Sequence, residues 1–507
     1  MAWRYNLARQ ATAMVRCGVQ KYAQPVQQQA LLPVSVRNMS TNKTRDIDYQ
    51  IHSQADLRFH ESTGSIVMTK GDGIYVIDEQ GNRYIEGMAG LWCTGLGFSE
   101  PRLAQAAYDQ MMTLPQYHTF GNKAHNKCID LAEKLVQVMP TCGKSPLNKV
   151  YFGSGGGDSN DTAIKIIWNY FNAIGKPEKK KLIGRVRGYH GSTVVTTSIG
   201  AQPGMHQPFD CPYGDRFVHT NVPHHYTFGK DGETEEDFAT RMADDLEKLI
   251  LAEGPDTVAA MFAEPLQGAG GVVIPPATYW EKMQTVLEKY NVMLVSDEVI
   301  TGFARTGNMW GCETYGMRPD LLTCAKQLSS GYLPISAVVV GQHVYDAIAD
   351  FSQKNGVFGH GYTYSGHPVS AAVALETIQI YEERDIVNSV RALSVPFVNG
   401  LTDLLDHPLV GEARGVGLVG VVQLIADKET KKAFHPSVKA GMKVFTACEE
   451  HGLIPRVTPP GDRLAFCPPM IITEEEIKDM LGRFRKALDS VEPALRAAQA
   501  DYEANNE

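Results

Sequence analysis

The segment "VYFGSGGGDSNDTAIKIIWNYF", residues 150–171, leads from a short apolar run through a glycine cluster into a helical pattern. Apolar side chains recur there at the spacing i, i+3, i+4, i+7: Ile164, Ile167, Trp168 and Phe171. Polar residues that suit a helix start precede them: Asp158, Ser159 and Asn160. The segment therefore predicts a strand, a tight glycine loop and a helix, which is the repeating unit of an α/β fold.

The glycine loop also predicts a binding site. Gly155, Gly156 and Gly157 would leave backbone N–H groups exposed at the positive end of the helix dipole, where a phosphate binds well. A flexible linker is the alternative, but the flanking segments are too strongly patterned for one. The loop matches neither G-x-G-x-x-G nor G-x-x-x-x-G-K-[ST], so dinucleotides and nucleoside triphosphates lose support.

The same alternation extends on both sides of this segment. Apolar runs suited to buried parallel strands occur at 149–152, 181–186, 258–265, 292–299 and 335–341. Helical patterns lie between them, for example at 240–252 and 277–290. Strands that are apolar throughout predict a mostly parallel sheet covered by helices on both faces. A pair of short strands is expected within 73–90, and longer helices with short strands after residue 366 predict a second, smaller layer.

Composition narrows the class of protein. The chain has 507 residues, of which 43% are hydrophobic, and a formal net charge of -9, which argues against nucleic acid as a partner. The sequence has no apolar run long enough for a membrane span. The nine cysteines are scattered without a C-x-x-C motif, which disfavours a metal site and a disulfide framework and favours a reducing compartment.

The amino-terminal segment differs from the rest of the chain. It is basic and contains no acidic residue before Asp46, and Trp3, Leu7, Ala11 and Met14 would share one face of a helix. This pattern is typical of a mitochondrial transit peptide, which we expect at residues 1–43 and which would direct the protein to the matrix. A disordered basic tail is the alternative interpretation.

An acidic pair follows one of the predicted strands. In "VMLVSDEVITGFARTG", residues 292–307, Asp297 and Glu298 stand at the carboxyl end of an apolar run, where open α/β sheets bind ligands. An acid at that place could neutralise a protonated ring nitrogen. A capping role or a Mg²⁺ ligand is the alternative for this motif alone.

A single lysine stands out in "PDLLTCAKQLSSGYLPIS", residues 319–336. Lys326 lies among apolar and small residues, and burial of its ammonium would make the amine a nucleophile for an aldehyde. Alone, it is better explained as a lysine whose side chain reaches to the surface. A phosphate loop, an acid for a ring nitrogen and a buried lysine are together what pyridoxal 5'-phosphate requires.

Four motifs, two of which overlap the segments described above, resemble those of a known family. They are "EPLQGAGGV" at 264–272, "SDEVITGFARTG" at 296–307, "AKQLSSGYLPISAV" at 325–338 and "GYTYSGHPVSAAVA" at 361–374. In this order the chain resembles the class III, fold-type I aminotransferases, and within them the ω-amino acid:pyruvate and 4-aminobutyrate:pyruvate transaminases. The resemblance implies a large domain (96–365) with a mostly parallel seven-stranded sheet. It also implies a smaller α/β domain made of segments 44–95 and 366–507.

The resemblance implies a role for each matching residue. Lys326 binds the cofactor aldehyde and moves the proton, Asp297 pairs with the pyridine nitrogen, and Tyr189 stacks on the ring. The other implied cofactor contacts are Gly155, Gly156, Gly157, His190, Glu264, Val299 and, across the interface of the family's homodimer, Thr363. Trp92 would line the substrate pocket. Gly157 stands where serine is frequent, and Ser336 where glycine is common.

Two further positions bear on substrate binding and on the choice of acceptor. Arg456 resembles the arginine that binds carboxylates in the family, with Arg463 as the alternative because the local alignment is uncertain. Relatives that use 2-oxoglutarate usually carry a glutamate where this chain has Ala269, so we expect pyruvate or glyoxylate as acceptor. Packing alone is the other explanation for Ala269.

These observations predict an enzyme that moves the amino group of an ω-amino acid to a small-molecule α-keto acid by a ping-pong mechanism. We expect 4-aminobutyrate as the best donor and β-alanine as the next, yielding a semialdehyde and alanine. The alternatives are a 2-oxoglutarate-dependent or alanine-glyoxylate type class III aminotransferase, a decarboxylase or aminomutase on the same fold, and an inactive binding protein. The catalytic residues argue against the last.

Overall fold

The computed structural model describes residues 41–143 and 145–505 of the chain. Residues 1–40 of the predicted transit peptide lie outside the described residues. Two compact units are present, one ending at Val67 and one beginning at Met68.

The first unit contains two short helices, α1 (Asn42–Tyr49) and α2 (Leu57–Thr63). Asp46 connects them, because its carboxylate accepts hydrogen bonds from Ser65 Oγ (2.5 Å), His52 Nε2 (2.9 Å) and His60 Nε2 (3.2 Å). The Ser65 hydroxyl and then the His52 imidazole lower the pKa of Asp46 to about 2. A single carboxylate therefore organises this segment.

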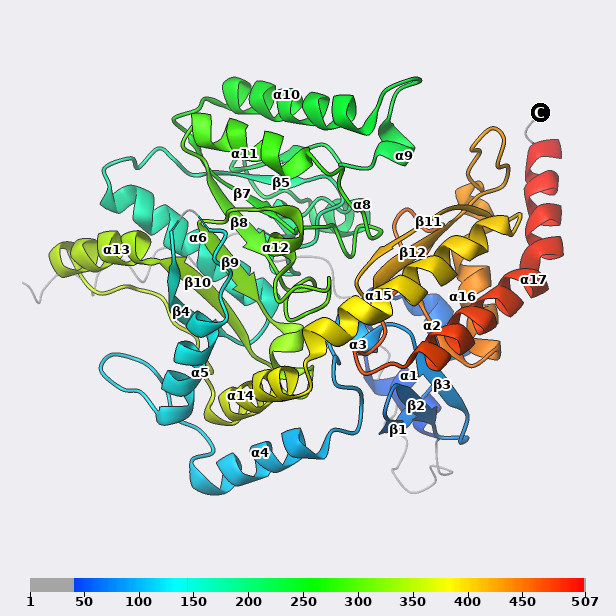
Figure 1. Cartoon of the computed structure of the whole chain (residues 1–507), viewed down its shortest axis with the longest axis horizontal. Coiled ribbons are helices and arrows are strands. Elements are labelled where there is room, and N and C mark those ends of the chain that lie inside the picture. The colour runs from blue at the N-terminus through cyan, green and yellow to red at the C-terminus, as the bar shows by residue number, and fades with distance from the viewer. Residues whose placement is uncertain (1–40, 144, 506–507) are drawn as a thin grey trace, which may run out of the picture. The chain divides into compact units, whose positions relative to one another are not determined.

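The second unit is built on a seven-stranded sheet with the order β4-β10-β9-β8-β7-β5-β6 (Figure 1). The strands are β4 (Leu147–Gly153), β5 (Lys181–Arg185), β6 (Phe217–Thr220), β7 (Val258–Ala263), β8 (Met293–Asp297), β9 (Leu321–Cys324) and β10 (Ser336–Gly341). Strands β9, β8, β7, β5 and β6 pair in parallel, and β10 runs antiparallel to both of its neighbours. The prediction of a mostly parallel seven-stranded sheet is confirmed. The predicted apolar runs do not include β6 and β9, which have four residues each.

Helices cover both faces of this sheet. They are α5 (Asn126–Gln137), α6 (Gly156–Ala173), α7 (Val194–Ile199), α10 (Glu235–Glu253), α11 (Tyr279–Lys289) and α13 (Gln342–Asn355). Helix α14 (Pro368–Glu383) packs against α5 and against α4 (Pro101–Thr113). Val338 and Val340 of β10 join a buried cluster with Ile164 of α6, whereas Val339 joins another with Leu287 of α11. Successive side chains of a strand thus meet helices on opposite faces, which explains why the strands are apolar throughout.

Shorter helices connect these elements. They are α3 (Ala89–Trp92), α8 (Pro203–His206), α9 (His225–Phe228), α12 (Gly311–Tyr315) and the 3₁₀ helices η1 (Gln207–Phe209), η2 (Lys326–Ser329), η3 (Leu404–Asp406) and η4 (Pro436–Val438). The predicted helices at 240–252 and 277–290 correspond to α10 and α11. Thr234 caps α10 by accepting a hydrogen bond from Asp237 N, so that helix begins earlier than its apolar pattern suggests.

Two smaller four-stranded sheets complete this unit. One has the order β1-β2-β3-β13, with β1 (Met68–Asp72), β2 (Tyr75–Asp78), β3 (Arg83–Glu86) and β13 (Leu453–Ile454). The other has the order β11-β12-β15-β14, with β11 (Val410–Val416), β12 (Val419–Leu424), β14 (Arg456–Thr458) and β15 (Arg463–Phe466). The predicted strand pair within 73–90 is present as antiparallel β2 and β3.

The remaining helices are α15 (Ile386–Asp403), α16 (Ala440–Glu450) and α17 (Glu474–Ala504). Strand β13 pairs in parallel with β3, so segments from near both ends of the chain share a sheet. The division into a large domain and a small domain at the stated boundaries stays a prediction. Among the described residues, no helix is long and apolar enough to cross a bilayer.

Candidate active site

The glycine loop lies between β4 and the first turn of α6. Gly155 is the N-cap of α6, and Gly156 and Gly157 are its first two residues. The Asp158 carboxylate turns back and accepts hydrogen bonds from Ser154 N and Gly155 N, both at 2.8 Å. The loop is therefore held open at the positive end of an 18-residue helix, as an anion site requires.

Two residues outside this loop, Ser336 and Val299, support it. Ser336 Oγ accepts a hydrogen bond from Ser159 Oγ (2.6 Å) and donates one to Asp158 Oδ1 (3.2 Å). A Cβ atom added at Gly156 would lie 2.9 Å from Cγ2 of Val299. The serine that replaces a common glycine thus supports the loop, and Gly156 leaves the room that Val299 occupies.

Asp297 is the last residue of β8 and is buried. Its carboxylate accepts hydrogen bonds from His190 Nδ1 (2.8 Å), Asn160 Nδ2 (2.8 Å) and Val299 N (3.0 Å). Thr323 donates to Asn160 Oδ1 and fixes the orientation of that amide. This network holds the Asp297 carboxylate in one position.

Glu298 points away from Asp297, as successive residues at a strand end do. Its carboxylate accepts hydrogen bonds from the N–H groups of Gly311 (2.8 Å) and Cys312 (2.7 Å) and from Thr301 and Ser296. Burial raises the pKa of Glu298. The two acids of the motif are therefore distinguished by structure, and Asp297 is the one near the lysine.

Lys326 begins η2 in a left-handed backbone conformation with φ of 49°. Burial lowers the pKa of its ammonium, while the carboxylates of Asp297 and Glu264 and the thiol of Cys93 act in the opposite direction. Its side chain keeps partial access to solvent although protein groups surround it. The predicted lysine and the predicted acid thus lie within electrostatic reach of each other.

Tyr189 and Glu264 meet beside this pair. Tyr189 N donates to Glu264 Oε1 (3.3 Å), and Gly268 N donates to Glu264 Oε2 (2.8 Å). Burial raises the pKa of Glu264. The Tyr189 hydroxyl lies 3.2 Å from Ser192 Oγ. The His190 side chain is buried and contacts the Asp297 carboxylate, so it supports that acid and does not line a cavity.

Trp92 reaches the site from a strained turn, since its φ is 64°. Its carbonyl accepts a hydrogen bond from Gln327 Nε2 (2.7 Å), the residue after Lys326. The Trp92 side chain is buried beside Leu266 and Cys467 in one apolar cluster. Asn160, Thr323 and Gln327 were not predicted as site residues, because a lone polar residue gives no signal in sequence.

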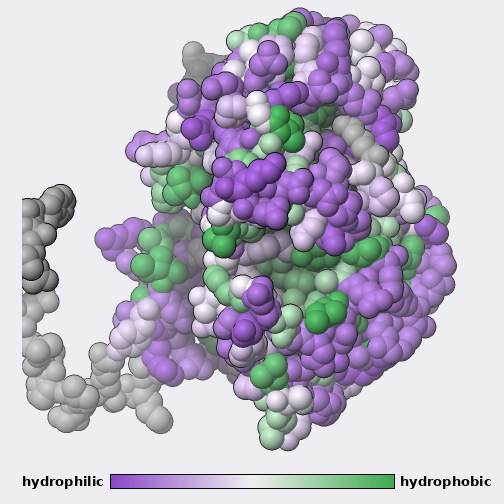
Figure 2. All heavy atoms as spheres, turned by 90° about the vertical axis from the view of Figure 1, so that its left-hand side faces the viewer, coloured by the Kyte–Doolittle hydropathy of each residue, from purple (hydrophilic) through white to green (hydrophobic). Residues whose placement is uncertain are grey.

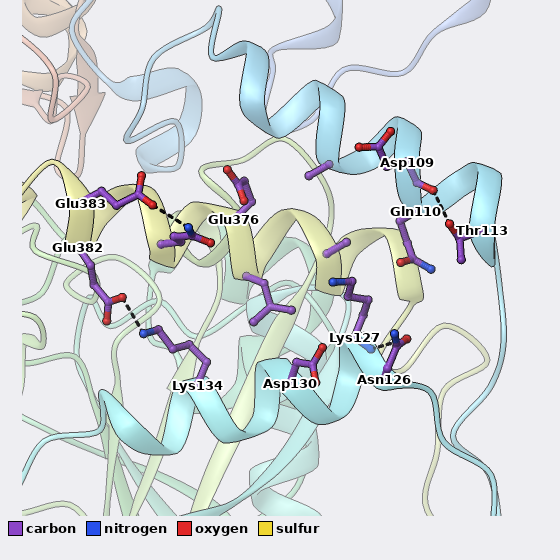
Figure 3. Close-up of a pocket in the computed structure, with 14 residues that line it drawn as sticks. Asp109, Gln110, Thr113, Asn126, Lys127, Asp130, Lys134, Glu376, Glu382 and Glu383 are labelled. Carbon is purple, nitrogen blue, oxygen red and sulfur yellow. Dashed lines mark hydrogen bonds and ion pairs between the residues drawn. The ribbon is translucent and has the colours of Figure 1, made fainter.

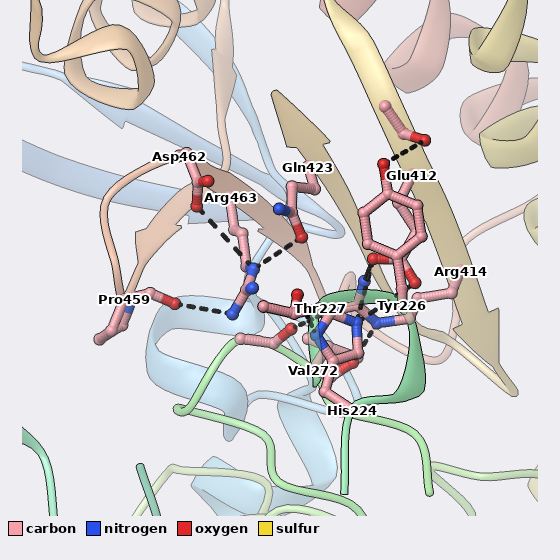
Figure 4. Close-up of polar contacts among 12 residues, drawn as sticks. His224, Tyr226, Thr227, Val272, Glu412, Arg414, Gln423, Pro459, Asp462 and Arg463 are labelled. Carbon is pink, nitrogen blue, oxygen red and sulfur yellow. Dashed lines mark hydrogen bonds and ion pairs between the residues drawn. The ribbon is translucent and has the colours of Figure 1, made fainter. Parts of the chain in front are cut away.

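The two candidate arginines have different surroundings. Arg463 donates to Gln423 Oε1 (3.1 Å) and to the Pro459 carbonyl (3.2 Å), and burial lowers its pKa to about 10 (Figure 4). Arg456 lies on β14, burial lowers its pKa, and Tyr189 is its electrostatic neighbour. This placement favours Arg456 over Arg463 for a substrate carboxylate.

The loop that contains Ala269 is fixed by a third arginine. Arg414 donates to the carbonyls of Val272 (2.8 Å) and Gly271 (2.7 Å) and pairs with Glu412, which also bonds His224 Nε2 at 3.0 Å (Figure 4). The partner of Arg414 is thus an acid on its own strand, β11. Ala269 itself supplies no carboxylate.

Thr363 lies in the segment before α14 and is exposed. Its predicted contact belongs to a second subunit and stays a prediction.

A groove on the surface lies apart from these residues. Side chains of α4, α5 and α14 line it, and Lys134 pairs with Glu382 at 2.6 Å (Figure 3). Arg102 bonds Glu376 and Glu383, both 2.6 Å away. None of the predicted site residues lines this groove.

Comparison with known proteins decides the family. A family model described as aminotransferase class-III matches residues 59–488. The chain belongs to the class III aminotransferases. The enzymes of this class depend on pyridoxal 5'-phosphate, are fold-type I proteins, and move an amino group from a small-molecule donor to a keto acid.

Relatives and solved structures agree with this assignment. This class III aminotransferase is 47% identical over 427 residues to gamma aminobutyrate transaminase 3, chloroplastic, of Solanum lycopersicum, covering 84% of the chain and 81% of the relative. It is 43% identical over 441 residues to gamma-aminobutyrate transaminase 1, mitochondrial, of Oryza sativa subsp. indica, covering 87% and 84%. The omega transaminase from Pseudomonas jessenii in complex with PMP superposes with a TM-score of 0.87 at 47% identity, covering 90% of this chain and 99% of that one.

The residues around Lys326 fit pyridoxal 5'-phosphate. The N–H groups at the start of α6 suit its phosphate, the fixed carboxylate of Asp297 suits a protonated ring nitrogen, and Lys326 supplies an amine of lowered pKa for the aldehyde. Val299 and Tyr189 would contact the two faces of the ring.

Proposed function

We propose that this class III aminotransferase is an ω-amino acid:pyruvate transaminase, with 4-aminobutyrate as the best donor and β-alanine as the next. The juxtaposition of Lys326 with a rigidly held Asp297 supports the transamination chemistry. The names of relatives such as the tomato gamma aminobutyrate transaminase support the donor. Glyoxylate is a second acceptor in this proposal.

Each residue contributes a defined step. Bound pyridoxal 5'-phosphate supplies an aldehyde that takes up the amino group and a ring that withdraws electrons from the substrate carbon. With the cofactor bound, Asp297 would pair with its ring nitrogen. The Lys326 amine, whose pKa burial lowers, would accept a proton from the donor carbon and deliver it to the carbon that had been the aldehyde carbon of the cofactor. Trp92 and Tyr189 exclude water and orient the substrate.

The acceptor preference rests on Ala269 and Arg456. A guanidinium at β14 beside Tyr189 can pair with the carboxylate of pyruvate or of 4-aminobutyrate. Ala269 leaves no carboxylate on the neighbouring loop to occupy such an arginine. Pyruvate has one carboxylate and needs one cationic partner, whereas 2-oxoglutarate has two.

We further propose a homodimer with active sites at the interface. The elements before and within α5 expose several large apolar side chains: Tyr108, Met111, Met112, Phe120 and Ile129. Figure 2 shows apolar side chains gathered around a hollow on the face that lies at the left of Figure 1. An exposed apolar surface of this kind is typical of protein–protein contacts. The exposed Thr363 would then reach the phosphate of the other subunit.

The proposed location is the mitochondrial matrix. The basic segment free of acidic residues supports import, and relatives are named mitochondrial or chloroplastic.

Half-reactions with separate keto acids test the proposal. The amino-loaded enzyme should react with pyruvate at least about tenfold more efficiently than with 2-oxoglutarate, and alanine should form from 4-aminobutyrate in a donor panel. Arg456→Met should raise KM for pyruvate by about 10- to 100-fold, the range for a lost charged hydrogen bond, and should affect a donor without a carboxylate much less. Equal use of 2-oxoglutarate by the wild type would contradict the acceptor assignment. Turnover of a single substrate without a keto acid would favour a decarboxylase or aminomutase.

A further inference from the structure

Two cysteines outside the transamination machinery have their sulfur atoms in contact. Cys142 Sγ lies 3.9 Å from Cys312 Sγ, although the residues are 170 positions apart in sequence. Cys142 follows α5 in an irregular loop and is partly exposed, whereas Cys312 is the second residue of α12 and is fully buried. No other described pair of cysteines has a hydrogen-bond contact between its sulfur atoms.

Neighbouring contacts hold the two segments together. The Trp310 indole N–H donates to the Val138 carbonyl at 2.5 Å, which connects the start of α12 to the end of α5. Trp310 and Cys312 are both buried in the main apolar core, and Cys142 packs against that core. The two sulfurs must approach each other by about 2 Å to reach bonding distance, and Cys142 lies in a loop.

We propose that Cys142 and Cys312 are a redox modification site, at which a peroxide converts the two thiols into a reversible disulfide. Cys142 is the thiol that the oxidant can reach. The Cys312 thiol lowers the pKa of Cys142, whereas the pKa of Cys312 lies well above its usual value, so Cys142 ionises first. A thiolate that is accessible and lies next to a second thiol is the arrangement that favours this chemistry.

The reaction has two steps. The Cys142 thiolate attacks one oxygen of hydrogen peroxide, so an S–O bond forms, the O–O bond breaks and hydroxide leaves, which oxidises the sulfur and reduces the peroxide. The Cys312 thiol then loses its proton and attacks the Cys142 sulfur. An S–S bond forms, the S–OH bond breaks, and the released hydroxide takes up the proton as water. Two thiols and one peroxide thus become one disulfide and two waters.

The buried end of this pair touches the acid beside Asp297. Cys312 N donates to Glu298 Oε1 at 2.7 Å, and the Cys312 thiol also hydrogen-bonds that carboxyl, whose pKa is raised by burial. Disulfide formation removes this S–H donor and draws its sulfur toward Cys142. Glu298 follows Asp297 directly in sequence, so we expect the oxidised enzyme to hold its cofactor less well. This consequence, but not the disulfide, rests on the proposed function.

Thiol mapping tests the modification itself. The holoenzyme is treated with hydrogen peroxide, unfolded in the presence of an alkylating reagent, and digested. Cys142 and Cys312 should lose alkylation together, appear in one cross-linked peptide and recover with dithiothreitol, while Cys324 and Cys448 remain free. Cys142→Ser and Cys312→Ser should each abolish the cross-link, and the matched variant Cys211→Ser, also partly exposed, should retain it. Oxidation of Cys142 to a sulfinic acid with Cys312 still free would overturn the proposal.

Cofactor retention tests the consequence. The oxidised wild type should bind pyridoxal 5'-phosphate about 2- to 10-fold more weakly, the range for one lost buried hydrogen bond, and dithiothreitol should reverse the change. Oxidised Cys142→Ser should not change. A cross-link with unaltered cofactor affinity would refute the coupling to Asp297 and leave the disulfide standing. Equal loss in Cys142→Ser would instead assign the effect to another thiol, such as Cys93 beside Lys326.

Discussion

Lys179 offers a comparison for Lys326 at the scale of single residues, because burial lowers the pKa of both. The Lys179 ammonium, with a pKa of about 8, donates to the carbonyls of Val258 (2.9 Å), Asn291 (3.0 Å) and Tyr290 (3.2 Å). Three carbonyls use all three of its protons, so Lys179 joins strands and loops. Lys326 instead lies within electrostatic reach of Asp297 and Glu264, and we propose that the cofactor binds beside these residues.

We therefore expect Lys326→Ala to lose the visible absorbance of the bound cofactor and to lower activity by at least about 10²- to 10⁴-fold, because no other amine can move the proton. Lys179→Met serves as the control. It should lower the melting temperature, since three carbonyls lose their donor, but the folded fraction should keep its colour. Absorbance spectra and thermal unfolding of both variants provide the measurement. Colour and activity that survive in Lys326→Ala would disprove the assignment.

At the scale of elements, the start of α6 depends on one acid. Asp158 is the third residue of the helix, and its carboxylate accepts hydrogen bonds from the N–H groups of Ser154 and Gly155. Asp237 has the same position in α10, where it caps an exposed helix start with Thr234. The two residues share a capping role, but only the first shapes an anion site.

Asp158→Ala should weaken pyridoxal 5'-phosphate binding by about 10-fold or more, because two charge-assisted hydrogen bonds that shape the loop are lost. Asp237→Ala should cost about 0.5–2 kcal/mol of stability, as a lost cap does, without changing cofactor affinity. Titration of the apoenzyme with cofactor, followed by fluorescence, compares the two. Equal affinities for both variants would show that the loop keeps its shape without Asp158.

At the scale of the whole molecule, the proposed homodimer depends on the exposed apolar residues of α4. Met111 and Met112 are 52% and 72% exposed, which is costly for adjacent large side chains unless a partner covers them. The second subunit would also bring Thr363 to the site. Assembly and activity are therefore expected to change together.

Met111→Glu combined with Met112→Glu should give a monomer with little activity, because two charges would have to be buried at the interface. Leu251→Glu is the matched control, since Leu251 is 54% exposed on α10, away from α4. Sedimentation velocity and activity measured on the same samples are the readouts. A double variant that remains an active dimer would place the interface elsewhere.

Part of the site could be predicted because its residues lie in contiguous motifs. The glycines before α6, Asp297 at the end of β8 and Lys326 after β9 each follow a strand, and parallel strands bring their carboxyl ends to one edge of the sheet. The site residues that the sequence did not predict are isolated polar residues that belong to no motif. Asn160, Thr323 and Gln327 hold the functional groups through contacts with segments more than a hundred positions away.

The sequence alone determined the class of fold and the cofactor and predicted Lys326 and Asp297 as the residues that act on it, because local patterning and spaced motifs carry that information. Tertiary structure decided which acid of the Asp297–Glu298 pair lies near Lys326, that Arg456 lies by Tyr189 and Arg463 by Gln423, and that Cys142 meets Cys312. Those outcomes depend on the direction of a side chain and on contacts between distant segments. Side-chain direction and long-range contacts produce no periodic pattern in the sequence, and both are set only when the chain folds.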